Sequence, residues 1–220
     1  MMEITKSEKE VWKMDQDFIR PPKLGPFDSK AKVVVVNQTG QTVLSTAVAH
    51  KYSNVFKDNL QWENLAEGAG TQPQEARYQT GLTALGADWW LVSWVTMDGR
   101  THYTAPNNLT WLLDFLTPHF QEIATSVSML FNTLAMMRTK LIQTPTALAI
   151  STAANITKLI ASNVLNDEKV EGFKEYMLRA EDAGQTLTIT LCGDGTVTFQ
   201  SPSGKESTGS AVMDALAGEG

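Results

Sequence analysis

Residues 88 to 103 read DWWLVSWVTMDGRTHY, and this stretch decides the fold. Its first half is almost entirely apolar, and the Asp98-Gly99 pair that follows is typical of a type I′ hairpin turn, because glycine tolerates positive φ. Alternate side chains of a strand point to opposite faces, so Trp90 and Trp94 share one face while Trp89 lies on the other. We therefore predict a central strand with a core on one face and a second layer, or a ligand, on the other.

The composition is that of a globular protein with few charges. A chain of 220 residues with 42% hydrophobic residues can bury one large core. The net charge of -6 argues against a nucleic acid as partner, because phosphate binding relies on clustered Lys and Arg. The single Cys192 rules out an internal disulfide and a Cys-based metal site, and we expect no cofactor. The first residues lack the apolar run of a signal peptide, so we expect a cytoplasmic protein.

Strand patterns also precede the hairpin. Residues 1–30 are expected to form an N-terminal arm and a proline-containing linker. The β-branched run at Lys32–Asn37 predicts a strand, and after a turn at Gln38–Gly40 we expect Thr42–His50 to be its partner strand. Residues 53–75 are polar, which favours an irregular loop.

A helical segment interrupts the β pattern. From Leu109 to about Ala183 the hydrophobic period changes from two to about 3.6, so we predict helices inserted into a β framework. Thr117-Pro118 and Thr144-Pro145 each have the form of an N-cap followed by proline, which predicts two helix starts. A third helix is expected to begin at Asn166–Glu168, where acidic side chains suit the N-terminal dipole.

These patterns predict an α+β fold, an antiparallel β-sandwich with an inserted three- to four-helix subdomain. The sandwich is assigned to residues 31–108 and 184–209, and a second hairpin is expected around Gly193–Gly195. Residues 109–183 form the helical insertion, and residues 210–220 form a C-terminal tail.

Six segments between residues 33 and 108 carry a family resemblance. They are VVVVNQTGQTV, AHKYS, LQWENLAEGA, ARYQTG, DWWLVSWV and DGRTHYTAPNN. This succession resembles a family of small β-sandwich proteins first noticed in nematodes and named for being up-regulated in long-lived insulin-receptor mutants. The resemblance covers residues 30–108 and, in part, 186–200, but not the helical segment. It implies a β-sandwich and a tendency to dimerise, and it supplies no catalytic residues.

One set of side chains has the residue types that acid–base chemistry needs. His50, Tyr52, Asp88 and His102 could form a catalytic site, since histidine titrates near neutral pH and a carboxylate can orient it. The structural alternative, which we favour, is that these residues are hydrogen-bonded positions at strand ends. No metal site is expected, because the histidines lack HxH or HxxxH spacing.

Two tryptophans form a second candidate site. Trp62 and Trp89, with Asp88 and Tyr52 beside them, are the candidate ligand-binding residues, because aromatic faces bind sugars and cations. We expect Trp62 and Trp89 to lie near one concave surface bordered by the loop at residues 51–75. The structural alternative is that both rings pack in the core.

The helical segment is poor in charge. Residues 123–137 and 141–157 contain no charged side chain. In the reading that we favour, the helices are covered by the sandwich, by each other or by a second subunit. In the alternative they form a hairpin that enters a bilayer, although helices of these lengths span only about 22 and 26 Å of the ~30 Å hydrocarbon core.

We therefore expect a non-enzymatic, lectin-like binding protein that recognises a glycan, a lipid head group or a protein partner, and that forms a homodimer. Two alternatives remain open. One is a membrane-active protein, similar to pore-forming toxins, that deploys the helical insertion. The other is a cofactor-free enzyme that uses His50, Asp88 and His102.

Overall fold

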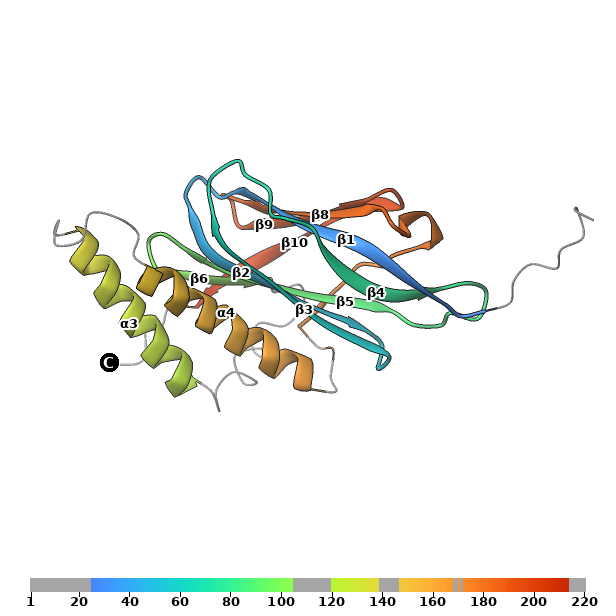
Figure 1. The fold of residues 1–220 in the computed structure, drawn as a ribbon, viewed down its shortest axis with the longest axis horizontal. Helices are drawn as coiled ribbons and strands as arrows, with labels where there is room; N and C mark the ends of the chain where they lie inside the picture. Colours follow the sequence, from blue (N-terminus) through green and yellow to red (C-terminus); the bar gives the residue numbers. More distant parts are fainter. Residues whose placement is uncertain (1–24, 105–119, 139–146, 168–169, 171, 214–220) are drawn as a thin grey trace, which may run out of the picture.

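Ten strands and two α-helices make up the part of the chain that the structure describes, which is residues 25–104, 120–138, 147–167, 170 and 172–213. Figure 1 shows this computed structural model. In chain order, the elements are β1 (Phe27–Gln38), β2 (Val43–Tyr52), β3 (Phe56–Leu65), β4 (Gln74–Thr80), β5 (Asp88–Thr96), β6 (Thr101–Thr104), α3 (Phe120–Arg138), α4 (Ala147–Asn166), β7 (Lys174–Glu175), the 3₁₀ turn η2 (Ala180–Asp182), β8 (Thr186–Cys192), β9 (Thr196–Ser201) and β10 (Gly204–Met213).

All the strands belong to one sheet that is nearly closed into a barrel. Its order is β3-β2-β5-β6-β10-β9-β8-β1-β4, with β7 beside β5. In Figure 1, β1, β8 and β9 lie in the upper layer, and β2, β3 and β5 lie in the lower layer. A β-rich fold with a helical part is confirmed. The prediction of a clear sandwich is wrong, because the sheet curls until its end strands β3 and β4 meet.

Side chains close the seam between β3 and β4. Asp58 on β3 accepts the backbone N–H of Arg77 at 2.9 Å and the Nε–H of Arg77 at 2.8 Å. The Gln74 side-chain amide donates to the Gln61 carbonyl at 2.7 Å. These bonds stand where a backbone ladder would complete the barrel, so the seam depends on particular residues.

The strand pairing differs from the sequence prediction at the N-terminal side. β1 pairs antiparallel with β4 and parallel with β8, whereas β2 pairs with β3 and β5. The expected hairpin between Lys32–Asn37 and Thr42–His50 is therefore wrong, and the sheet is not purely antiparallel. Asn37 explains the crossing from one layer to the other. Its amide donates to the carbonyls of Gln41 and Leu65, at 2.8 and 2.9 Å, and this fixes the turn between the layers.

The central hairpin is confirmed, but its turn type is not. β5 and β6 pair antiparallel on either side of residues 97–100. A type I′ turn needs positive φ at both central residues, and in this turn only Gly99 has it, with φ of 88°. The Gly99 N–H donates to the Thr96 carbonyl at 2.9 Å, so the connection is a tight turn followed by a left-handed glycine.

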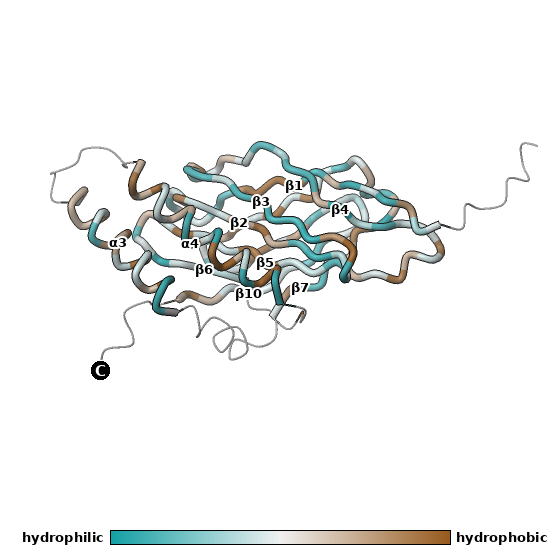
Figure 2. The backbone as a smooth tube through the Cα atoms, turned by 60° about the horizontal axis from the view of Figure 1, so that its bottom comes forward, coloured by the Kyte–Doolittle hydropathy of each residue, from teal (hydrophilic) through white to brown (hydrophobic). Residues whose placement is uncertain are grey.

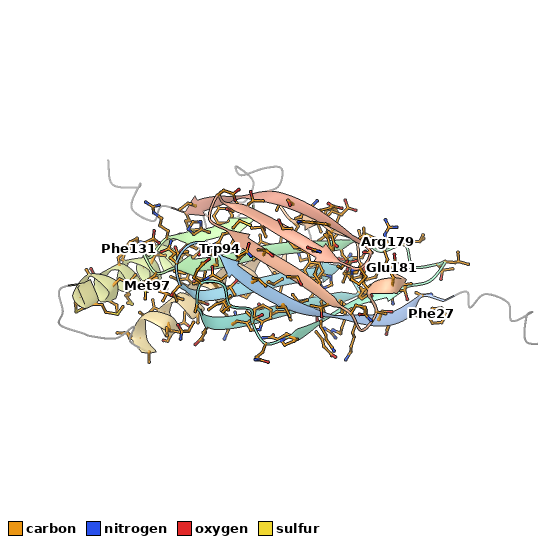
Figure 3. All side chains as sticks on the ribbon, turned by 90° about the horizontal axis from the view of Figure 1, so that it is seen from above. Phe27, Trp94, Met97, Phe131, Arg179 and Glu181 are labelled. Atoms are coloured by element: carbon orange, nitrogen blue, oxygen red, sulfur yellow. The ribbon has the colours of Figure 1, made fainter. Side chains whose placement is uncertain are left out.

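β5 separates two hydrophobic cores, as the sequence predicts. The inner core fills the barrel around Trp90, Val92 and Trp94. The outer core lies between the sheet and the helices and includes Leu91 and Val95. In Figure 3, Trp94 lies toward the helical end of the barrel, near the Met97 and Phe131 labels. Both faces of β5 are therefore covered, which explains its continuous apolar sequence.

Two helices, rather than the three or four predicted, appear in the described part of the chain. α4 packs on the outer face of β2, β3 and β5, and α3 packs on α4 (Figure 1). The third helix predicted from Asn166–Glu168 is wrong, because the described residues 172–183 contain β7 and η2 instead. The predicted starts at Thr117-Pro118 and Thr144-Pro145, like the arm at residues 1–24, lie outside the described residues. Residues 210–213, expected in the tail, extend β10.

The threonine hydroxyl groups at four positions of the helices find partners one turn earlier. Thr125, Thr133 and Thr152 each donate to the carbonyl four residues before, at 2.7–2.8 Å. Thr157 is fully buried and also lies 2.8 Å from the Ser45 hydroxyl of β2. These bonds satisfy polar groups in a charge-poor layer that packs on the sheet.

We predict that the helical layer contributes strongly to stability. Ile160 is fully buried in the outer core, so Ile160→Ala should lower the free energy of unfolding by about 2–5 kcal/mol in urea denaturation. Lys158→Ala, at an exposed position on the same helix, should change it by less than about 0.5 kcal/mol. Equal effects of the two substitutions would show that α4 does not pack as described.

Candidate functional site

A slot interrupts the barrel wall between β7 and β10. β10 pairs with β6 over residues 210–213, but over residues 204–209 its one partner within the described part of the chain is β9. The one described partner of β7 is the start of β5. The space between these two edges, which we call the β7–β10 slot, has a volume of about 510 Å³. Its lining residues are Trp89, Phe173, Lys174, Glu175, Met177, Glu206, Ser207 and Thr208.

The strand register sets which side chains form the floor and the rim of the slot. Lys174 lies opposite Trp90, and Glu206 lies opposite Phe199, so both point toward the inner core. Their side chains form an ion pair that spans the slot. Trp89 and Glu175 lie opposite each other on the outer face, where they form the rim on the β7 side. Figure 2 shows β7 and β10 together beside β5.

A buried lysine holds one wall of the slot. Lys51 is the neighbour of Trp89 on β2, and only 2% of it is exposed. Its ammonium donates to the Asp167 carbonyl and lies 4.9 Å from the centre of the Phe173 ring. Burial lowers the pKa of Lys51 to about 8, with a smaller effect from the nearby Lys57. This contact fixes the segment after α4 against the sheet.

The inner core contains a second candidate site, which we call the His50 cluster. It consists of His50 on β2, Asp58 on β3 and Asp88 at the start of β5. The Nε2 atom of His50 is 2.8 Å from Asp88 Oδ1, and its Nδ1 atom is 3.3 Å from Asp58 Oδ2. The indole of Trp90 stacks on the imidazole, with ring centres 4.0 Å apart. Each ring nitrogen therefore faces a carboxylate in a site that has no solvent access at His50.

The electrostatics of the cluster favour a charged histidine. Burial by itself lowers the pKa of His50, but the hydrogen bonds to Asp58 and Asp88 outweigh it and hold this pKa above 6.5. Burial likewise opposes ionisation of Asp58, yet the bonds from His50 and Arg77 hold its pKa below 3.8. The raised pKa favours the protonated ring, in which both nitrogens donate to the carboxylates that they face.

The two carboxylates of the His50 cluster link it to other parts of the fold. Asp58 also accepts the seam bonds from Arg77, and Asp88 accepts the backbone N–H of Leu178 at 2.8 Å. Both ring nitrogens of His50 are thus engaged by carboxylates that have further partners in the fold. Within the described residues, no group of three His, Cys, Asp or Glu side chains could hold a metal ion.

The other candidate catalytic residues do not complete a site. Tyr52 is buried in the inner core, and its hydroxyl accepts the Gly86 N–H at 3.2 Å. His102 stacks on Trp94 with ring centres 5.1 Å apart. Trp94 is four residues along β5 from Trp90, or about 13 Å, so His102 lies far from His50. The structure thus brings His50 and Asp88 together but leaves His102 apart.

The two candidate tryptophans lie on opposite faces of the sheet. Trp62 is in register with Thr46 and Trp94, which face inward, whereas Trp89 is in register with Lys51 on the outer face. The prediction of one shared concave surface is therefore wrong. The expected loop at residues 53–75 is also wrong for residues 56–65, which form β3. Of the four candidate ligand-binding residues, Trp89 borders the slot, and Asp88 and Tyr52 are buried inside.

Sequence reasoning missed Asp58 and the β10 side of the slot. Asp58 had a signal, because Phe56, Leu60 and Trp62 alternate in apolar character and Asp58 interrupts them on the same face. A charged residue at an inward position indicates a buried partner. Glu206 carried no such signal, since its role depends on a gap in strand pairing.

The fold and sites define a class of protein, a nearly closed β-barrel with a helical layer on one face, a sealed charge cluster inside and a slot in its wall. The chain belongs to the family described as Up-Regulated in long-lived daf-2, whose family model matches residues 28–210. This confirms the family resemblance and extends it through the helical segment. No curated protein matches the chain.

We predict that His50 is essential for stability. His50→Ala leaves two buried carboxylates without their cation, so the free energy of unfolding should fall by about 3–5 kcal/mol in urea denaturation. The matched control is His102→Ala, which removes one ring stack and should cost about 1 kcal/mol. Similar losses for both variants would contradict the structural role of the cluster.

We also predict a pH window for this stabilisation. A raised folded-state pKa makes the His50 contribution complete below pH 6.5 and lost as the pH rises through the folded-state value. A lowered pKa makes the Asp58 contribution complete above pH 3.8 and lost as the pH falls through its folded-state value. The difference in unfolding free energy between wild type and His50→Gln should therefore be largest between pH 3.8 and 6.5 and shrink at higher pH. A difference that grows above pH 6.5 would contradict a charged His50.

Proposed function

We propose that this protein is a non-enzymatic binding protein that recognises its partner through the β7–β10 slot. The observation that carries the proposal is a slot of about 510 Å³ with the half-buried Trp89 on its rim. Aromatic side chains with a polar neighbourhood are typical of recognition surfaces. Glu175 is exposed on the same rim, and among the described residues it forms no ion pair.

The enzyme alternative has weaker support. His50 is fully buried and both of its nitrogens face carboxylates, so a substrate could not reach it without opening the barrel. His102 lies two alternate positions along β5 from the His50 row and stacks on Trp94. Neither histidine lines the slot.

The membrane-active alternative rests on the helices. Among the described residues, α4 alone is long and apolar enough to cross a bilayer, and it carries a single charge at Lys158. Half of its apolar window is buried inside the fold, as expected for a core helix of a water-soluble protein. Met129, Met136 and Leu148 add exposed apolar side chains on this layer. We favour the structural role because the inner sides of both helices pack in the outer core.

The ligand class follows from the rim and floor of the slot, which combine an aromatic ring with three charged side chains. A glycan, a lipid head group or a protein segment could each use such a surface. A homodimer and a cytoplasmic location are further parts of the proposal, and sedimentation of the purified protein at micromolar concentration tests the first.

We predict that binding depends on Trp89. The purified protein should bind at least one of three probes: a glycan array, vesicles of anionic or neutral phospholipid, or a displayed peptide library. Trp89→Ala should weaken that binding about tenfold or more, as expected for a central aromatic contact. The matched control is Trp62→Ala, which removes the same ring from the opposite face of the sheet and should have little effect.

Two results would overturn the proposal. One is binding that Trp62→Ala abolishes and Trp89→Ala leaves intact. The other is release of dye from vesicles at neutral pH that stops when the exposed Leu148 is replaced with Asp in a folded variant. The second result would favour the membrane-active alternative, because a charge at an exposed position should leave the fold intact but oppose insertion.

A further inference from the structure

We propose that the β7–β10 slot binds an extended, basic segment of a partner protein, which adds to the sheet as a strand beside β10. This inference rests on the proposed function and names the class of partner. It follows from the backbone edges of the slot, the distance across it and the charge on its rim.

Among the residues that the structure describes, both edges of the slot are open strand edges. Residues 205–209 of β10 pair with β9 on one side only, and Lys174–Glu175 pair with β5 on one side only. Alternate residues of such an edge direct their N–H and C=O groups away from the sheet. Residues 204–207 and 209 of β10 are exposed. An incoming backbone can therefore reach unpaired donors and acceptors along this edge.

The slot has the width of missing backbone rather than a simple surface groove. β6 fills the place between β5 and β10 at one end of the sheet, where it pairs with both. At the other end, β7 pairs with β5 but not with β10. Lys174 and Glu206 meet across this gap through the ends of two long side chains. The backbones thus stand further apart than hydrogen-bonded neighbours, which are about 4.8 Å apart.

The rim selects a cationic side chain. Trp89 and Glu175 are direct cross-strand partners on the outer face, so an aromatic ring and a carboxylate stand side by side. An ammonium or guanidinium group there gains both a cation–π contact and an ion pair. Lys174 is already paired with Glu206, which leaves Glu175 as the acidic group for the partner. Phe173 and Met177 offer apolar contact to a neighbouring side chain.

The experiment selects displayed eight-residue peptides on the purified full-length protein, with counter-selection on Glu175→Lys. Glu175 is exposed, so this variant should fold normally while its rim charge is reversed. We expect enriched peptides that contain Lys or Arg among residues with high strand propensity. Binding of a synthetic peptide should weaken about tenfold with Trp89→Ala or Glu175→Lys, and Trp62→Ala should leave it unchanged.

Two further measurements separate strand addition from other binding. Hydrogen exchange should show new protection of the backbone amides of residues 205–209 when the peptide is bound. N-methylation of alternate peptide amides should abolish binding in one register, because it removes the donors that an added strand needs.

Each other outcome overturns the inference in a distinct way. A peptide that binds without protecting residues 205–209, or that tolerates N-methylation in both registers, would use the slot without adding a strand. Selection of acidic or uncharged peptides would refute the charge argument. If no peptide is enriched but a glycan or vesicle binds in a Trp89-dependent manner, this inference fails and the proposed function stands; if none of the probes binds, both fail.

Discussion

The buried contact of His50 with Asp58 and Asp88 is the interaction on which the rest of the structure depends. Each carboxylate has a second duty, since Asp58 closes the β3–β4 seam through Arg77 and Asp88 receives the Leu178 N–H. Three distant stretches of the chain therefore meet at one buried cation. Charges inside a core are costly to desolvate, so they favour a single arrangement in which all are paired.

The cluster also specifies the strand register. His50 lies opposite Asp58 on β3 and opposite Trp90 on β5. A slip of one residue would turn the imidazole to the outer face and leave both carboxylates without a cation in the core. The polar residues thus supply specificity, and the apolar residues supply most of the burial.

β5 shows how much the sequence could predict. Its almost entirely apolar sequence and the glycine after it correctly predicted a central strand between two layers, because burial on both faces leaves a signal in nearly every residue. The change of period correctly predicted helices as well. The pairing of β1 could not be read in this way. A short turn normally joins neighbouring strands, but Asn37 and the contacts of β1 with β8 direct the chain into the other layer.

The candidate sites differ in the same respect. His50 and Asp88 were identified by residue type, and their contact follows from local register, since β2 and β5 are neighbours. The slot depends on where β7 ends and where β10 leaves β6, which no local pattern encodes. Asp88 and Trp89 are adjacent in sequence but face opposite sides of the strand. Their proximity in the sequence therefore suggested a common surface that the pleat of the strand does not permit.

The parallel pairing of β1 with β8 has a consequence for synthesis on the ribosome. Val33 waits for Leu187, its partner about 150 residues later, which at typical translation rates takes on the order of ten seconds. β2, β3 and β5 are closer in sequence and can pair well before then. During this interval β1 can pair with β4, but its other edge has no neighbouring strand in the half-built barrel. This β-branched edge of β1 is therefore open to wrong pairing while the chain is still being made.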